Sequence, residues 1–322
     1  MHGSRLVAFS VSLIVCALLA LAETPHATPP YWAFCINPAT TAPAKPDNNP
    51  RHLPNSTATF TTAQTQDLFS APDWHPDTHP AMPEIVAHGR KPDVYACGYC
   101  HLPNGQGRPE NSSLAGLPAE YIVRQLADFK SGARKGSDPR HLPVVNMISR
   151  ETKATDAEIA ASAQYFAQLP RKPWIRVVET DTVPKTHVGG WMLVADTPAV
   201  TETIGQRIIE TPEDLERTEL RDDSSGFIAY VPVGSLQKGR VLVATGGGKT
   251  VYCEKCHGTG LRGSGTVPPI AGRSPSYIVR QLFDIQSGAR AGILSRDMRS
   301  QTEKLTIDDM IAIAAYVSSL QP

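Results

Sequence analysis

The sequence contains Cys97-Gly98-Tyr99-Cys100-His101 and, further along, Cys253-Glu254-Lys255-Cys256-His257. These two copies of Cys-x-x-Cys-His are separated by 253 − 97 = 156 residues. The sequence YIVRQL at 121–126 recurs at 277–282, and SGAR at 131–134 recurs at 287–290, both at the same offset. A chance motif does not carry its downstream sequence along at a constant offset. The chain therefore contains an internal duplication.

Each motif has the spacing that covalent attachment of haem c requires. Two cysteines three positions apart lie on one face of a helical turn, so both sulfurs reach the vinyl groups of one porphyrin. The next residue, His101 or His257, is then placed beneath the iron as a ligand. A disulfide, or a zinc site built from paired Cys-x-x-Cys motifs, explains neither the histidines nor the repeated flanks. We therefore predict two covalently bound haem c groups, attached through four cysteines: Cys97, Cys100, Cys253 and Cys256.

The N-terminal residues have the pattern of a secretory signal. Arg5 precedes an apolar run from Leu6 to Ala22 that ends in small residues. We predict a signal peptide at 1–22 and export to the periplasm, where haem c is attached. An uncleaved membrane anchor is the alternative, because the run approaches spanning length.

Composition excludes some classes of function. The chain has 31 basic and 31 acidic residues. This balance argues against nucleic-acid binding and against a polybasic membrane patch, although peripheral membrane association stays open. Cys16 lies in the signal and four cysteines lie in the motifs, so Cys35 is alone and no disulfide framework is expected.

Residues 23–84 hold 12 of the 28 prolines, which predicts an extended leader rather than a domain. Trp32 and Phe34 flank Cys35 and are candidates for docking on a haem domain. His75 and His79 suggest a metal site at first sight, but the intervening Pro76 prevents the helical face that such a pair would use. We expect these histidines to be solvated or packed.

Two segments are predicted to be helical and to surround the motifs, at 85–170 and 235–322. Ile122, Leu126 and Phe129 form an apolar stripe, which is repeated by Ile278, Leu282 and Ile285. Capping boxes begin the last helix of each segment at Thr155 and Thr306. Between these segments, residues 171–234 contain short β-like runs separated by Gly, Pro and Asp, which predicts a small strand-rich connector.

The second axial ligand of each iron decides between electron transfer and substrate chemistry, since an open face permits binding. Met147 and Met298 occur in matching contexts, Asn146-Met147-Ile148-Ser149 and Asp297-Met298-Arg299-Ser300, in what we expect to be loops. A thioether ligand favours Fe(II) and raises the reduction potential. Gap-filling core methionines are the alternative. Met82, Met192 and Met310 are poorer candidates.

The chain resembles the dihaem class I cytochromes c of the cytochrome c4 type. The resemblance rests on CGYCH, CEKCH, the two YIVRQL helices, the two methionines and the terminal helices. It implies a mainly α fold with two tandem cytochrome c domains, at 85–170 and 235–322, joined by the connector at 171–234. It also implies propionate-binding arginines, for which the candidates are Arg124, Arg134, Arg280 and Arg290.

One departure from the family concerns the proximal histidines. Pro268-Pro269-Ile270-Ala271-Gly272 resembles the family stretch whose proline carbonyl orients the proximal histidine, here His257. The first unit has Ser112-Ser113-Leu114-Ala115-Gly116 at the aligned place, and only Pro109 is nearby. The sequence therefore does not identify the partner of His101.

We predict a periplasmic electron carrier that is not an enzyme. Its partners would be a dehydrogenase or quinol-oxidising donor and an oxidase or reductase acceptor. The alternative is a dihaem enzyme, a peroxidase or sulfur-compound oxidoreductase, with one open or labile haem. Cys35 and the departure near His101 are the features that favour it.

Overall fold

The structure is a computed structural model that describes residues 28–39 and 46–322. The predicted signal peptide, residues 1–22, lies outside these ranges. Within them, none of the helices has both the length and the apolar character needed to cross a bilayer.

The first Cys-x-x-Cys-His motif belongs to a group of helices that follow one another along the chain. Helix α5 buries Ile122 and Phe129 of the predicted stripe. Helix α7 begins in the predicted capping box, in which Thr155 Oγ1 accepts from the Glu158 amide and Glu158 accepts from the Thr155 amide. The bounds are α3 (Glu84–Ala87), α4 (Cys97–His101), α5 (Ala119–Lys130), α6 (Leu142–Ser149) and α7 (Asp156–Gln168).

A second group repeats this order around the second motif. Thr306 and Asp309 form the predicted capping box at its last helix. Gly239 lies where α9 crosses α13, and an added Cβ there would lie 1.9 Å from the Ala312 carbonyl oxygen, so this crossing requires glycine. The bounds are α9 (Ser235–Thr245), α10 (Glu254–His257), α11 (Pro275–Gln286), α12 (Arg296–Thr302) and α13 (Ile307–Ser319).

The segment between the two groups forms strands. Strand β9 pairs in parallel with β3 and antiparallel with β8. Its buried residues Phe227, Ala229 and Val231 alternate with half-buried ones, as expected for a strand with one face on a core. Two further antiparallel pairs are β4 with β7 and β5 with β6. The bounds are β3 (Ile175–Glu179), β4 (Thr182–Pro184), β5 (Thr186–Gly189), β6 (Met192–Ala195), β7 (Thr201–Thr203), β8 (Ile209–Pro212), α8 (Leu215–Glu219) and β9 (Phe227–Val231).

The described part of the predicted leader is mostly irregular but closely packed. Trp32 and Phe34 on α1 are buried, and the Phe34 ring meets Phe283 of α11 edge to face. Trp74 is also buried, and its large ring adds much apolar area to the core. The regular elements are α1 (Tyr31–Phe34), β1 (Pro50–Arg51), β2 (Phe60–Thr61), α2 (Thr62–Thr65) and the 3₁₀ turn Pro76–Thr78.

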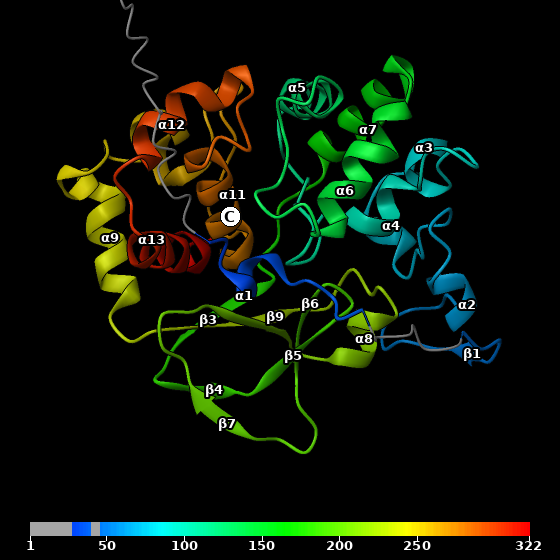
Figure 1. The fold of residues 1–322 in the computed structure, drawn as a ribbon. Helices are drawn as coiled ribbons and strands as arrows, with labels where there is room; N and C mark the ends of the chain where they lie inside the picture. Colours follow the sequence, from blue (N-terminus) through cyan, green and yellow to red (C-terminus); the bar gives the residue numbers. More distant parts are fainter. Residues whose placement is uncertain (1–27, 40–45) are drawn as a thin grey trace, which may run out of the picture.

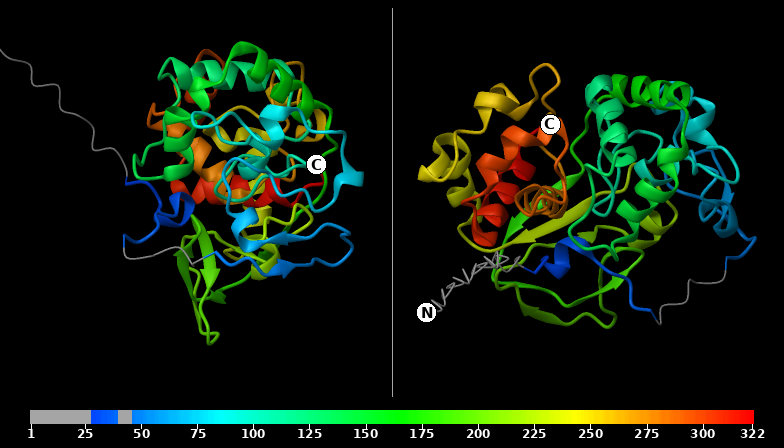
Figure 2. Two further views of the ribbon diagram at one scale, coloured as in Figure 1. Left: turned by 90° about the vertical axis from the view of Figure 1, so that its right-hand side faces the viewer. Right: turned by 45° about the horizontal axis from the view of Figure 1, so that its top comes forward.

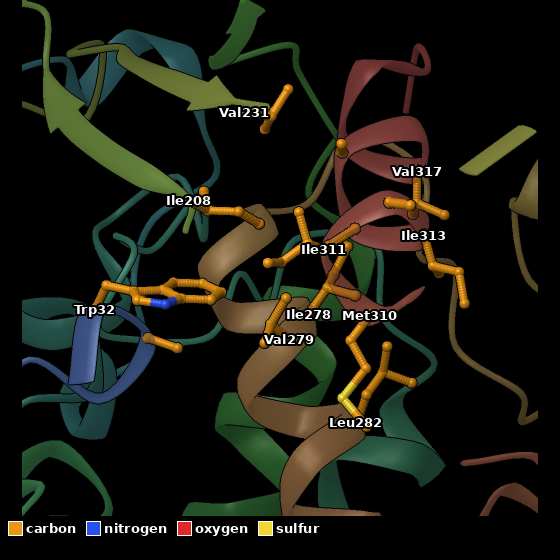
Figure 3. Close-up of a cluster of buried hydrophobic side chains, with 14 of the residues drawn as sticks. Trp32, Ile208, Val231, Ile278, Val279, Leu282, Met310, Ile311, Ile313 and Val317 are labelled. Atoms are coloured by element: carbon orange, nitrogen blue, oxygen red, sulfur yellow. The ribbon is translucent and has the colours of Figure 1, made fainter. Parts of the chain in front are cut away.

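The two helical groups lie side by side, and the strands run beneath both (Figure 1). Both views of Figure 2 show the strands on one side of the helices. The largest apolar cluster joins α11 and α13 to Trp32, Ile208 and Val231 (Figure 3). A second cluster lies within the first group and includes Ile122, Ile159 and Phe166. The predicted docking of the aromatic pair on a helical unit is confirmed.

Candidate haem centres

Both Cys-x-x-Cys-His motifs line one cavity of about 580 Å³ between the two helical groups. Its walls come from α4, α5 and α6 on one side and α10, α11 and α12 on the other. Apolar side chains such as Ile122, Phe166 and Ile278 supply much of the lining. Among the described residues, none from 171–234 lines the cavity, so the strands support the helices without covering this space.

The first histidine is held by a main-chain carbonyl. His101 Nδ1 lies 2.8 Å from the Ser112 carbonyl oxygen, and the side chain is buried beside Phe166. A carbonyl oxygen only accepts, so Nδ1 carries the hydrogen and Nε2 carries the lone pair. Burial lowers the pKa of His101 to about 4, which keeps the imidazole neutral and able to bind a metal.

The second histidine has the same arrangement. His257 Nδ1 lies 2.9 Å from the Pro268 carbonyl oxygen, and burial lowers the pKa of this imidazole also. In both units the acceptor stands 11 residues after the histidine, since 112 − 101 and 268 − 257 are equal. The partner of His101 that the sequence did not identify is therefore Ser112, through its backbone.

The four motif cysteines also lie at the cavity. Cys97 and Cys100 are contributed by α4, and Cys253 and Cys256 by the start and body of α10. Burial raises the pKa of Cys100 and of Cys253 to about 11, and it also raises the pKa of Cys97 well above its ordinary value, so these thiols are neutral at pH 7.

The two candidate methionines line the same cavity, but they lie on helices. Met147 belongs to α6 and Met298 to α12, where loops were expected. Among the described residues, the other methionines do not line it. Met310 is fully buried in α13, and the Met192 sulfur accepts a hydrogen bond of 3.2 Å from Arg108 Nη2.

The predicted arginines divide into two kinds. Arg134, Arg280 and Arg290 line the cavity, whereas Arg124 is on the exposed face of α5. Arg280 donates to the carbonyl oxygens of Pro109 at 2.8 Å and Glu110 at 3.3 Å, and also to that of Ala33.

Arg134 and Arg290 each cross to the opposite unit. They form an antiparallel bridge flanked by Lys135 N to Ala289 O and Ala291 N to Ala133 O, both 2.7 Å. Arg290 Nη2 donates to the Tyr121 hydroxyl at 2.7 Å. Arg134 Nη2 makes a longer contact of 3.4 Å with the Tyr277 hydroxyl.

Arg273 is a cavity residue that the sequence reasoning missed. It donates from Nε to the Pro269 carbonyl oxygen at 2.6 Å, and also to that of Ser113. Its position directly after the Pro268–Gly272 stretch was the available signal. Within the described ranges, its Nη2 and the Nε of Arg290 are buried without a hydrogen-bond partner.

These residues fit haem c. Paired cysteines adjoin a neutral imidazole with its Nε2 lone pair available, and the walls are apolar. The unpartnered guanidinium nitrogens of Arg273 and Arg290 offer donors to propionate carboxylates. A fold of this kind with two such sites defines a c-type cytochrome.

Comparison with known proteins supports this class. Residues 88–170 match the model of the cytochrome c family, described as "Cytochrome c". The chain is 24% identical over 229 residues to cytochrome c4 of Azotobacter vinelandii, covering 70% of this chain and 84% of that protein. It is 26% identical over 231 residues to the thiosulfate dehydrogenase electron acceptor of Thiomonas intermedia, covering 71% and 80%. Superposition on the reduced recombinant cytochrome c4 of Pseudomonas stutzeri gives a TM-score of 0.45, with 19% identity and coverage of 70% of this chain and 93% of that one.

The chain contains a cytochrome c domain, is similar to cytochrome c4 and binds haem c covalently. The resemblance drawn from the two motifs and their flanks is confirmed by the family match and the cytochrome c4 relatives. One of these relatives is named for electron transfer, as the electron acceptor of a thiosulfate dehydrogenase.

Cys35 lies elsewhere. Its thiol is buried, donates to the Trp32 carbonyl oxygen at 3.3 Å, and does not line the cavity. Burial raises its pKa to about 12, so the thiol is neutral. This arrangement favours a packing role for Cys35, which we considered more probable than a role as a haem ligand.

Proposed function

We propose that this protein is a dihaem electron carrier. In this proposal His101 and Met147 would hold one haem iron, and His257 and Met298 would hold the other. The chain is a tandem pair of cytochrome c units, 85–170 and 235–322, separated by the strand-rich segment 171–234. The observation that carries the proposal is that each unit brings a cysteine pair, a buried imidazole and a thioether to one cavity.

Haem c supplies a one-electron Fe(III)/Fe(II) couple. The residues of this chain set the conditions for that couple. Backbone carbonyls fix both imidazoles in one tautomer, so each Nε2 would keep its lone pair for the iron. Apolar walls and thioether ligands favour the reduced state and raise the potential. Buried arginines offer charge-assisted hydrogen bonds to the propionates, which holds each macrocycle in place.

The partner class we propose is a dehydrogenase that delivers single electrons, with an oxidase or reductase as acceptor. The relative named thiosulfate dehydrogenase electron acceptor supports a dehydrogenase as the donor. We place the protein in the periplasm, on the strength of the signal-like residues 1–22. Fractionation of cells followed by haem staining tests this location.

The test of the function is the sulfur-to-iron charge-transfer absorbance of the oxidised holoprotein, normalised to total haem. Two methionine-ligated irons per chain are expected. One or none would overturn the closed carrier. Bis-histidyl and thiolate ligation give different spectra, so the spectrum would also identify which ligand stands in place of methionine.

A dihaem enzyme is the second candidate, and Glu151 is the observation that favours it. This carboxyl lines the cavity beside α6, and burial raises its pKa to about 8. The position aligned with it in the second unit is Thr302. A proton donor beside only one centre is what reaction at that centre would require. Turnover with peroxide or reduced sulfur compounds, lost in Glu151→Gln, would favour this candidate.

A further inference from the structure

A second cluster of ligand-type side chains lies outside the haem cavity. His75 Nε2 is 3.0 Å from Asp222 Oδ1 and 3.9 Å from Asp223 Oδ1. The ligand atoms of all three residues lie within 4.8 Å of one another. None of the three lines the cavity that holds the Cys-x-x-Cys-His motifs. The histidine comes from the N-terminal segment and the aspartates from the loop after α8, 147 residues further along.

The cluster is buried, and one of its carboxylates has no hydrogen-bond partner. Asp222 is 1% exposed, and its oxygens accept from Arg217 Nε at 2.7 Å and from the Ser224 amide at 2.9 Å. Asp223 is 2% exposed, and among the described residues neither of its carboxylate oxygens has a partner. An unpartnered buried carboxylate is strongly unfavourable, so a group of this kind calls for a cation.

The other basic side chains around Asp223 bind other partners and do not contact its carboxylate. Arg217 is committed to Asp222 and to the Ser224 hydroxyl at 2.8 Å. His79 uses Nε2 on Asp73 at 3.1 Å and Nδ1 on the Tyr165 hydroxyl at 3.0 Å. Among the described residues, His75 is the only basic side chain within 4.0 Å of the Asp223 carboxylate, and its distance of 3.9 Å is too long for a hydrogen bond.

We propose that His75 Nε2, Asp222 Oδ1 and the Asp223 carboxylate bind one Zn²⁺ ion. Zinc takes imidazole nitrogen and carboxylate oxygen in a tetrahedron with bonds of about 2.0–2.2 Å, which places neighbouring ligands about 3.3–3.6 Å apart. The observed separations of 3.0 and 3.9 Å bracket that range. A water molecule completes four ligands. Ca²⁺ fits less well, because it prefers six to eight oxygen ligands.

This site joins three parts of the chain. Beside His75, Trp74 Nε1 donates to the Leu220 carbonyl oxygen at 2.8 Å. In the same loop as the aspartates, Arg221 Nη1 donates to the Tyr99 carbonyl oxygen at 2.9 Å and its guanidinium lies 3.5 Å from the centre of the Tyr99 ring. Tyr99 lies between the two cysteines of the first motif. Zinc therefore fastens the N-terminal segment to a loop that supports the first haem unit.

The test uses metal-stripped holoprotein titrated with ZnCl₂. We expect one Zn²⁺ per chain by calorimetry and metal analysis, and a rise in the thermal midpoint, because an ion that binds only the folded state stabilises it. CaCl₂ should produce neither effect. Asp223→Asn and His75→Gln should each abolish the stoichiometric binding. Absence of stoichiometric zinc in the unsubstituted protein overturns the proposal.

Asp223→Asn gives a second readout, the stability of the folded protein with and without zinc, which does not depend on loss of zinc binding. With a chelator present, this variant should be at least as stable as the unsubstituted protein, since it removes an uncompensated buried charge. With zinc present the order should reverse. The same order under both conditions contradicts a metal site and points to a His75–carboxylate ion pair. His187→Gln is the matched control, because His187 also meets one aspartate, Asp196 at 2.8 Å, but is exposed; loss of zinc binding in this control would also overturn the assignment.

Discussion

The two haem units hold their histidines in the same way with different residues. Ser112 serves in the first and Pro268 in the second, and each presents a main-chain carbonyl to Nδ1. Every residue has a carbonyl oxygen, so the course of the backbone, and not the type of side chain, determines whether this hydrogen bond forms. A departure from a family's side-chain pattern therefore need not change the chemistry of a site when a backbone atom accepts the hydrogen bond.

The two units differ more in how the N-terminus of the helix after the Cys-x-x-Cys-His motif is held. Ser274 is the N-cap residue of helix α11, and its hydroxyl donates a hydrogen bond of 2.8 Å to Glu210 on β8. Glu210 also accepts from the Ser276 amide at 3.2 Å. The N-cap residue of helix α5 is Pro118, which makes no side-chain cap. The first unit carries Glu151 at the cavity where the second carries Thr302. Four experiments test how far this asymmetry extends.

Deletion of the candidate sulfur ligands should have the largest effect. Met147→Ala and Met298→Ala should each remove about half of the charge-transfer absorbance, because one of two thioether ligands is lost. The affected haem should then bind cyanide or imidazole, and its potential should fall. Spectroelectrochemistry of the two variants measures both changes. A variant with unchanged absorbance would identify a unit whose methionine is a core residue.

Glu210 should give the second unit a pH-dependent stability. Burial raises the pKa of Glu210 to about 7 from an ordinary value of 4.5, so the folded state holds this proton more tightly than the unfolded state. Stability is therefore lost as pH rises from about 4.5 through 7. Glu210→Gln should match the unsubstituted protein near pH 4 and exceed its free energy of unfolding by about 3 kcal/mol at pH 8. Guanidinium unfolding at several pH values measures this difference, and a parallel offset at all pH values would refute it.

The seam between the units offers a matched pair of hydroxyl deletions. Tyr121→Phe removes the 2.7 Å contact with Arg290, and Tyr277→Phe removes the 3.4 Å contact with Arg134. We expect a loss of about 1.5 kcal/mol for the first and about 0.5 kcal/mol for the second, since hydrogen bonds to charged groups weaken with length. Unfolding of the holoproteins at neutral pH compares them. Equal losses would mean that the two arginines are equivalent in solution.

The smallest effect is expected when the second unit is given the residue of the first. Pro268→Ser keeps the carbonyl that accepts from His257, so both reduction potentials should stay unchanged. Stability should fall by about 0.4–1 kcal/mol, because the unfolded chain gains freedom. Pro269→Ser is the control for loss of a proline alone. A shift of potential confined to Pro268→Ser would show that the proline ring itself tunes this centre.

Local patterns predicted much of this molecule. The helices with Ile122 and Ile278, the caps at Thr155 and Thr306, and the cavity-lining motifs all follow from spacings within one helix. The helical setting of Met147 and Met298 was missed, because Leu142–Ser149 and Arg296–Thr302 are short and lack caps.

Long-range pairings could not be predicted in this way. His75 meets Asp222 across 147 residues, and Arg290 meets Tyr121 across 169. Pro76 correctly argued against a site shared by His75 and His79, whose nitrogens have separate partners. The aspartates that approach His75 come from a loop whose position depends on the whole fold.

The single cavity shared by both units also bears on biogenesis. A chain that failed to receive haem would leave the apolar lining of this cavity of about 580 Å³ in contact with water, and would lose the stabilisation that burial of this lining provides. A chain loaded at one motif only would keep part of that penalty, and both units would share it through their common wall. We therefore expect chains that lack one or both haems to be less stable, and more readily cut by proteases, than fully loaded chains.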